Sequence, residues 1–281
     1  MFLVRKMSTD DLDFAVRLTD TKNWGLTKED FLFMMELEPD GCFTLLEGSE
    51  KVGIVTSINY GRIGWFGNLI VEKKHRRKGA ASLLVKQVIN YLMGKGAETV
   101  GLYSYMDAVT FYRRLGFGSD EEFTVIEGKA RKSESESFDV KRVEGKEDLE
   151  KIIEYDISCL NILRRKLLEA IFRKPENLCY FSVENGEICG YIMAKVYEGF
   201  AEIGPLICNR ESTVAALNLI EAVLNMVEGS HVTLCLPKKE ISIRNFLNER
   251  GFSESFDVVR MFFKPISIKD YIYIAESLER G

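Results

Sequence analysis

Runs and periodic spacings of apolar residues predict short strands followed by helices. Residues 66–71 (Phe-Gly-Asn-Leu-Ile-Val) form a short β-prone run, which predicts a strand. After a basic loop, apolar residues at positions 83, 84, 88, 91 and 92 follow the 3.6-residue period of one buried helix face. Residues 100–104 are predicted to form a second strand, and residues 108–115 a short helix that ends at Gly116.

The basic loop before the long helix has the features of a pyrophosphate-binding site. A helix that begins after Gly79 has unpaired N–H groups and the positive end of its dipole at that point. Arg76, Arg77 and Lys78 directly precede it, and Gly79 and Ala80 leave room for close approach. These features favour a bound pyrophosphate. Taken alone, such a basic run is more typical of a solvated turn, and it is sometimes a nucleic-acid-binding patch.

The sequence repeats itself over a long interval. Residues 42–53 and 179–190 both read as strand, tight turn and strand, at an offset of 137 residues. The offset becomes 135 residues where residues 81–92 align with residues 216–227. A repeat of this length indicates two whole domains. We expect a first domain at 1–130, a polar linker at 131–137 and a second domain at 138–281.

The change of offset points to a functional difference between the two copies. The two missing residues fall in the second copy's counterpart of the basic loop, residues 209–215. This segment has no glycine and only one basic residue, so it lacks the cradle of N–H groups that a pyrophosphate needs. Where the first copy has Tyr112, the second has Leu247, which cannot donate a proton. The second copy is therefore predicted to lack the site.

Two motifs in order resemble those of a known superfamily. Arg76-x-x-Gly79-x-Ala81 resembles the Arg/Gln-x-x-Gly-x-Gly/Ala motif of the GNAT superfamily of acyl-CoA-dependent N-acyltransferases. Residues 108–117 resemble the Ala-x-x-x-Tyr-x-x-x-Gly-Phe segment of the same superfamily. The whole chain resembles tandem GNAT proteins with an active first domain and a degenerate second. The fold that the resemblance implies is α/β, with two GNAT-like domains that each have a mixed, splayed sheet flanked by helices.

The resemblance implies where the cofactor binds. The sheet would splay after the strand that ends at Val71, and pantetheine would lie there as an additional strand bonded to the main chain of Leu69 and Val71. The pyrophosphate would bind the amides of residues 77–82 and the charged side chains of Arg76 and Lys78. The expected cofactor is acetyl-CoA or another acyl-CoA, and its expected contacts are Leu69, Ile70, Val71, Arg76, Arg77, Lys78, Gly79, Ala80, Ala81 and Ser82.

The resemblance also implies direct attack of a neutral amine on the thioester, with both substrates bound together. Tyr112 is the expected general acid for the departing thiolate, and a ring that only packs under the cofactor is the alternative. The general base stays open between Asp107, Glu72 and Asn68 with a water.

Three residues are candidates for the acceptor site. Trp24 lies in the connection that borders the acceptor in this superfamily, although it is equally typical of a core contact. Asn68 and Tyr105 are the other two, and the superfamily often has asparagine where Tyr105 stands. In the second domain, Arg164 or Arg165 could reach an anionic substrate group, with a solvated charged face as the commoner alternative.

Composition narrows the class of protein. The chain has 281 residues and a net charge of −5, which argues against nucleic-acid binding as its main task. Six cysteines without a Cys-x-x-Cys pair are expected to be buried free thiols of a cytoplasmic protein. With two histidines, no metal site is expected, and without a run of about 18 apolar residues no membrane span. The N-terminus is too short for a signal peptide and reads as a strand.

The expected function is transfer of an acetyl group from acetyl-CoA to the primary amine of a small molecule. A non-catalytic acyl-CoA-binding sensor or interaction protein is the alternative, and Tyr112 discriminates between them because a binding module has no need of a phenol beside the sulfur. The acceptor, the acyl length and the oligomeric state stay open, because acceptor residues in this fold lie on variable segments.

Overall fold

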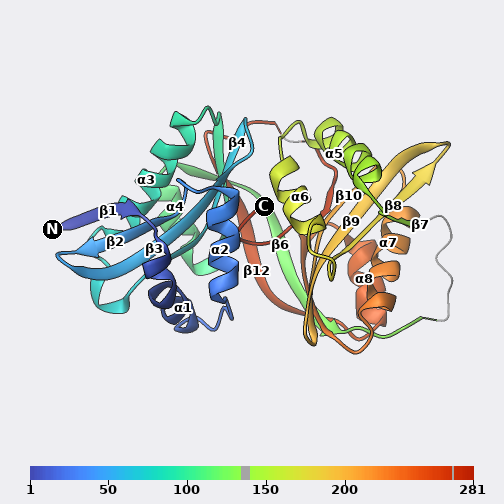
Figure 1. The fold of residues 1–281 in the computed structure, drawn as a ribbon, viewed down its shortest axis with the longest axis horizontal. Coiled ribbons are helices and arrows are strands. Elements are labelled where there is room, and N and C mark those ends of the chain that lie inside the picture. Colours follow the sequence, from blue (N-terminus) through green and yellow to red (C-terminus); the bar gives the residue numbers. More distant parts are fainter. Residues whose placement is uncertain (134–139, 268) are drawn as a thin grey trace.

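The computed structural model describes residues 1–133, 140–267 and 269–281 (Figure 1). The first half contains β1 (Phe2–Lys6), α1 (Leu12–Asp20), α2 (Lys28–Leu37), β2 (Phe43–Glu47), β3 (Glu50–Asn59), β4 (Ile63–Val71), α3 (Ala80–Gly94), β5 (Thr99–Tyr105), α4 (Val109–Arg114) and β6 (Phe117–Lys129). Three 3₁₀ turns accompany them: η1 (Thr9–Asp11), η2 (Lys73–His75) and η3 (Met106–Ala108).

The second half repeats this order of elements. It contains β7 (Val140–Arg142), α5 (Lys146–Leu160), α6 (Arg165–Phe172), β8 (Leu178–Glu184), β9 (Glu187–Tyr197), β10 (Phe200–Cys208), α7 (Thr213–Met226), β11 (His231–Pro237), α8 (Ile241–Glu249), β12 (Ser253–Phe263) and β13 (Ile272–Ile274). The predicted strand–turn–strand repeat is therefore present as β2–β3 and β8–β9. Of the predicted linker 131–137, residues 134–137 lie outside the described residues.

The two halves exchange their last long strands. Within one mixed sheet of order β1-β2-β3-β4-β5-β12-β6-β11-β10-β9-β8-β7, β12 lies between β5 and β6. Met261 of β12 faces Leu102 of β5, and Val125 of β6 faces Cys235 of β11. Strand β6 of the first half is thereby held between two strands of the second, and the sheet is continuous across the molecule.

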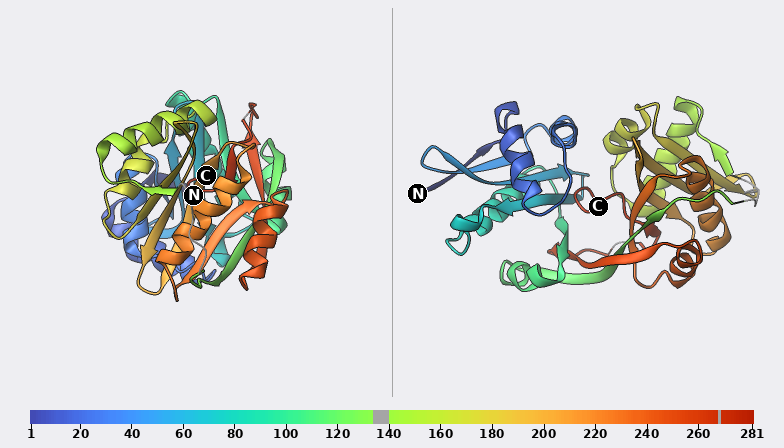
Figure 2. Two further views of the ribbon diagram at one scale, coloured as in Figure 1. Left: turned by 90° about the vertical axis from the view of Figure 1, so that its right-hand side faces the viewer. Right: turned by 90° about the horizontal axis from the view of Figure 1, so that it is seen from below.

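Helices cover the sheet in groups that follow the hydrophobic cores (Figures 1 and 2). Helices α3 and α4 pack on the first half, and α7 and α8 on the second. Residues of α1, α2, α5 and α6 share one core that joins the halves. In α3, Leu84 and Val88 are fully buried as the apolar period predicts, but Leu83 is 37% exposed because it faces away from the sheet.

The first-half sheet splays at the predicted place. Strands β4 and β5 pair in parallel only from Ile63–Thr99 to Trp65–Gly101, although both strands continue beyond this point. Within β4, the register against β3 shifts between the Ile54–Ile70 and Thr56–Gly67 pairs, which leaves a bulge. Asn68 lies in this bulge with a positive φ of 52°. The end of β4 thus has one edge without a strand partner.

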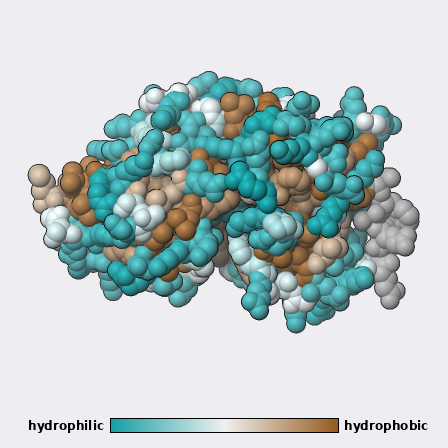
Figure 3. Space-filling view, viewed as in Figure 1, coloured by the Kyte–Doolittle hydropathy of each residue, from teal (hydrophilic) through white to brown (hydrophobic). Residues whose placement is uncertain are grey.

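All six cysteines are buried and free, as expected. No helix of the described residues is both long enough and apolar enough to cross a membrane. On the face shown in Figure 3, apolar side chains are scattered among hydrophilic ones, and the surface is indented between the two halves.

Candidate active site

The predicted phosphate loop ends at a left-handed glycine. Gly79 is the N-cap of α3 with φ +83°, and a Cβ built there would meet no atom within 4 Å. The first hydrogen bond of helix α3 runs from the Leu83 N–H to the Gly79 carbonyl. The N–H groups before Leu83 therefore have no partner within the helix. The first turn of α3 also has no acidic residue. This helix end is open to an anion, and its dipole attracts one.

The basic side chains before Gly79 are exposed, and one of them is fixed. Arg77 has a positive φ of 62°, which turns the backbone into the loop. The Nε of Arg76 donates to the carbonyl of Val71 at 2.8 Å, which ties the loop to the end of β4. Arg76, Arg77 and Lys78 therefore lie next to the open helix end, and this end lies beside the end of β4.

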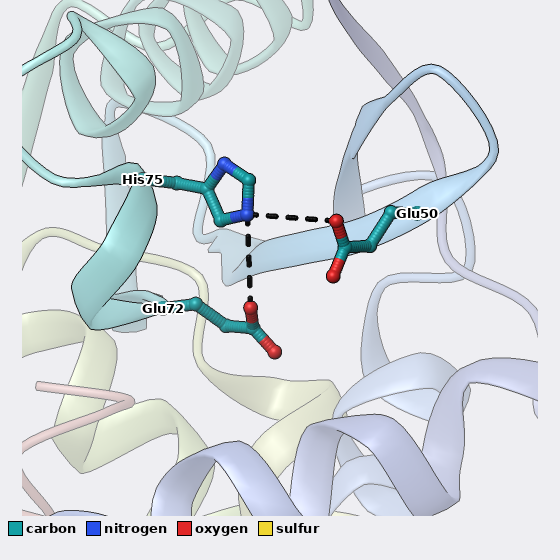
Figure 4. Close-up of side chains that lie close together, drawn as sticks. All are labelled: Glu50, Glu72 and His75. Carbon is teal, nitrogen blue, oxygen red and sulfur yellow. Dashed lines mark ion pairs between the residues drawn. The ribbon is translucent and has the colours of Figure 1, made fainter.

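A buried histidine anchors the start of this loop (Figure 4). His75 is 5% exposed, and its Nε2 lies 3.7 Å from Glu50 and 3.8 Å from Glu72. Its Nδ1 lies 2.6 Å from a Glu47 oxygen, although neither ring nitrogen has hydrogen-bond geometry to a described residue. Glu50, Glu72 and His75 are close enough together to hold a metal ion, but the Lys74 ammonium already pairs with both carboxylates. The group holds η2 against the β2–β3 hairpin.

Tyr112 lies at the mouth of the splay. Its ring packs against Phe66, the first β4 residue beyond the paired segment, at 6.2 Å between centroids, and against Phe117 at 5.8 Å. Tyr112 is 8% exposed, and burial raises the pKa of its phenol. Its hydroxyl makes no hydrogen bond to another group in the described part of the chain. The phenol is therefore protonated and free to donate.

The main chain of Leu69, Ile70 and Val71 forms the open edge of the splay. Ile70 and Val71 pair with Ile54 and Gly53 on the β3 side, while β5 pairs with none of them. The Val71 carbonyl accepts from Arg76, and the other main-chain polar groups of this edge are where an extended amide chain could add as a strand.

Two of the three candidate acceptor residues lie together. The rings of Trp24 and Tyr105 stack at 6.5 Å with an interplanar angle of 18°. The third candidate, Asn68, is buried, and its amide donates to the Thr56 hydroxyl at 3.1 Å. Of the candidate bases, Asp107 is exposed on η3, and Glu72 pairs with Lys74 at 3.5 Å.

The arginines of the second half do not reach the site. Arg164 is 2% exposed and donates to the Asp156 carboxylate at 3.2 Å and to the Tyr191 hydroxyl at 3.1 Å. Arg165 pairs with Glu150 on the surface. Arg164 is a buried structural ion pair, whose partner lies eight positions earlier in the sequence, so it is not available to an anionic substrate group. Arg165 lies on a solvated charged face, which is the commoner alternative given above.

The groove of the second half is filled by the chain itself. Strands β10 and β11 pair from Phe200–His231 to Ile203–Leu234, and β13 then pairs with β10 at Leu206–Ile274. The Ala275 N–H donates to the Cys235 carbonyl at 2.8 Å, so the segment also bonds to β11. The one basic residue of the loop before α7, Arg210, is bound to Asp270 and Glu240. Among the residues that the structure describes in this half, β13 and the segment after it occupy the place of the splay.

Sequence patterns did not predict where the segment after β13 lies. A Cβ on Gly67 would come within 2.5 Å of Glu279 Cα, so this segment lies directly against β4. No motif marks it, because its contacts depend on the fold.

The comparisons with known proteins agree with this architecture. Residues 11–117 match the acetyltransferase (GNAT) family, and residues 152–273 match an acetyltransferase (GNAT) domain. The chain is 22% identical to holothin acyltransferase of Pseudoalteromonas sp. (strain SANK 73390) over 264 residues, which cover 92% of this chain and 88% of that protein.

Two solved structures share the fold over nearly the full length. A protein of Pyrococcus horikoshii, described provisionally as an acetyltransferase, has a TM-score of 0.81 at 20% identity, covering 100% of this chain and 96% of its own. A tandem GNAT protein from the clavulanic acid biosynthesis pathway has a TM-score of 0.64 at 13% identity, covering 95% and 100%. Identities this low show the fold alone. Together with the two family matches, they show that the chain belongs to the GNAT acyltransferase family, with two GNAT domains in tandem.

Proposed function

We propose that the protein transfers an acetyl group from acetyl-CoA to a primary amine of a small-molecule acceptor. The observation that carries this proposal is an asymmetry between the halves. The first half combines an open splay, an open helix N-terminus at Gly79 and a buried phenol at Tyr112. In the second half β13 closes the splay. Members of this family use acyl-CoA co-substrates, so one cofactor binds per chain.

The cofactor lies along β4. Its pantetheine amides bond to the main chain of residues 69–71, and its pyrophosphate to the amides of residues 77–82. Arg76 and Lys78 add charge-assisted contacts to the phosphates. Binding both substrates together makes the attack effectively unimolecular, which supplies much of the rate.

The amine attacks the thioester directly. A main-chain N–H of residues 69–71 stabilises the oxyanion. Coenzyme A leaves as a thiolate, and Tyr112 protonates it. Because burial raises the pKa of this phenol, it keeps its proton until the thiolate forms.

Two observations support a small-molecule acceptor. The relative named holothin acyltransferase supports a small molecule rather than a protein, and the aromatic pair Trp24–Tyr105 offers a wall for it. Six reduced, buried cysteines fit a cytoplasmic location.

The first experiment is isothermal titration of acetyl-CoA into the wild type, Gly79→Ala and Gly79→Glu. Both variants impose a side chain at a positive φ, so Gly79→Ala controls for backbone strain. We expect one site per chain, weakened in Gly79→Ala and abolished in Gly79→Glu by the added carboxylate. Two sites per chain would contradict the assignment of the second half, and no binding would refute the transferase. Thiol release with a panel of amines then tests turnover.

A further inference from the structure

The splay of the first half provides no carboxylate of its own. Strand β4 reads Ile-Gly-Trp-Phe-Gly-Asn-Leu-Ile-Val, without one ionisable side chain, and β5 offers only tyrosines. An amine is largely protonated near neutral pH and must lose a proton to attack. A positioned acceptor for that proton contributes about 10²–10⁴-fold in rate in enzymes of this kind. The splay itself offers Asn68 with a water for this step, so a carboxylate acceptor has to come from another segment.

The segment after β13 supplies one. Residues 275–281 run from the second half to the first and end between the two halves (Figures 1 and 2). Leu278 packs in a cluster with Phe256, whose ring lies 5.3 Å from that of Tyr105. The next residue, Glu279, has its main chain against Gly67 on β4. Glu279 thus lies beside the point where β4 leaves β5.

Buried charges fix this segment in place. Glu276 is fully buried and pairs with Lys195 at 2.6 Å and with Arg280 at 2.8 Å. The Tyr60 hydroxyl donates to the Arg280 carbonyl at 2.8 Å, which ties the segment to the first half. Glu279 stands between these anchored residues, yet it is only half-buried and has no ion pair with any residue that the structure describes.

The segment that carries Glu279 lies near the aromatic pair of the acceptor site, because Leu278 packs with Phe256 and Phe256 contacts Tyr105. Burial, and next the negative charge of Glu279, raise the pKa of Tyr105. Tyr105 in turn stacks on Trp24. One carboxylate beside two aromatic rings is a combination that binds ammonium groups, through ion pairing and cation–π contact.

We propose that Glu279 binds the attacking amine of the acceptor and accepts its proton. This inference rests on the proposed function, because it assigns a residue to that reaction. The bound ammonium gives one proton to the Glu279 carboxylate, which releases it to solvent, and the neutral nitrogen then attacks the thioester carbonyl and forms the C–N bond. As the tetrahedral adduct collapses and the C–S bond breaks, the second proton passes from nitrogen to Glu279, and the departing sulfur takes one from Tyr112. Exchange with solvent restores both residues, so the second domain completes the active site of the first.

The other carboxylates are less well placed. Glu72 lies beyond the end of β4 and pairs with Lys74. Asp107 is exposed on η3, two positions after Tyr105. These two residues are the rivals that the experiment must exclude.

The test compares Glu279→Gln, Glu279→Asp and Asp107→Asn with a matched control, Glu187→Gln, at the exposed first residue of β9. Thiol release from acetyl-CoA is followed with butylamine, benzylamine and 1,4-diaminobutane. We expect Glu279→Gln to lower kcat/KM for the best amine by about 10²-fold while KM for acetyl-CoA is unchanged. Glu279→Asp should recover part of the rate, and Glu187→Gln should match the wild type. A loss in Asp107→Asn but not in Glu279→Gln would overturn the proposal.

A binding measurement separates this inference from the proposed function. Benzylamine is titrated into the wild type and Glu279→Gln, each saturated with coenzyme A. Weaker benzylamine binding in Glu279→Gln supports the ammonium site even if no amine is turned over, in which case only the transferase proposal fails. Equal binding to both proteins, or no binding to the wild type, refutes the role of Glu279 whatever the catalytic result.

Discussion

At the scale of single residues, we expect loss of the Tyr112 hydroxyl to lower the rate of acyl transfer more than it lowers the stability of the fold. The ring carries the packing against Phe66 and Phe117, and the hydroxyl has no partner within the described residues. We therefore expect Tyr112→Phe to lower kcat by about 10²-fold, the contribution of one general acid. The melting temperature and the affinity for acetyl-CoA should stay close to those of the wild type. Steady-state kinetics, calorimetry and titration measure the three quantities.

The pH dependence of the wild type gives a second measure of the same phenol. A general acid stops working when pH rises above its pKa, and burial moves the pKa of Tyr112 upward. In the free enzyme Tyr112 therefore stays protonated through and beyond the ordinary tyrosine pKa of about 10. The contrary result would be a fall in kcat/KM on the alkaline side below about pH 10, present in the wild type and absent in Tyr112→Phe. It would mean that burial does not raise the pKa of the Tyr112 phenol.

At the scale of elements, the contact between β4 and the segment after β13 is tight at Gly67. A methyl group there would come within 2.5 Å of Glu279 Cα, which is a backbone atom and cannot turn aside. We expect Gly67→Ala to displace the segment and to lower the free energy of unfolding by about 1–3 kcal/mol. Chemical denaturation measures the change.

Gly94 provides the control for this substitution. It is the last residue of α3, and a Cβ there would meet nothing within 4 Å. Gly94→Ala should leave stability unchanged or raise it by about 0.5–1 kcal/mol. If Gly67→Ala were as stable as Gly94→Ala, the segment after β13 would move away from residue 67 at little cost. The position of Glu279 would then not be fixed by this contact.

Elements built from local sequence were the ones that could be predicted. The strand, basic loop and helix around Gly79 follow from neighbouring residues, and so does the repeat that relates the two halves. The exchange of β6 and β12 could not be predicted, because either strand satisfies the same apolar pattern beside either partner. Glu279 and Arg164 were missed or misread for a related reason. Their roles come from residues that only the folded chain brings close, such as Gly67 and Tyr191.

At the scale of the whole molecule, a buried ion network fixes the segment that bonds to Tyr60 of the first half, and it makes stability depend on pH. Burial alone would raise the pKa of Glu276, but Arg280 and Lys195 lower it to about 2. A carboxyl with a lowered pKa stabilises the fold fully above its unfolded value of about 4.3. That contribution is lost as pH falls toward the folded value.

Removing the charge of Glu276 tests this linkage. Glu276→Gln leaves Lys195 and Arg280 with Glu202 as their remaining carboxylate partner among the described residues, at 2.5 Å and 3.4 Å, and we expect a loss of about 1–3 kcal/mol at neutral pH. Between about pH 4.3 and pH 2 the wild type should lose stability faster than the variant, so the two curves converge. Urea denaturation across this range measures both. Parallel curves would mean that Glu276 carries no lowered pKa in the folded chain.

The strand exchange predicts that neither half is complete alone. Val259 and Met261 of β12 belong to the core under α3, and Ile126 of β6 belongs to the core under α7. A fragment 1–133 therefore lacks part of its own core and exposes a strand that fits another. We expect it to bind acetyl-CoA poorly when expressed alone and to recover binding when expressed with a fragment 140–281. Titration and gel filtration of the purified fragments measure this.

A charged residue introduced into β12 tests whether this strand is what restores acetyl-CoA binding in the fragment experiment. Met261 is fully buried opposite Leu102, so Met261→Asp in the second fragment would place a carboxylate in the first fragment's core. We expect this variant fragment to restore no binding, whereas Glu187→Gln in the same fragment should restore it fully. If fragment 1–133 alone bound acetyl-CoA as tightly as the whole chain, β12 would be dispensable for the site. The second domain would then not be required for acetyl-CoA binding by the first.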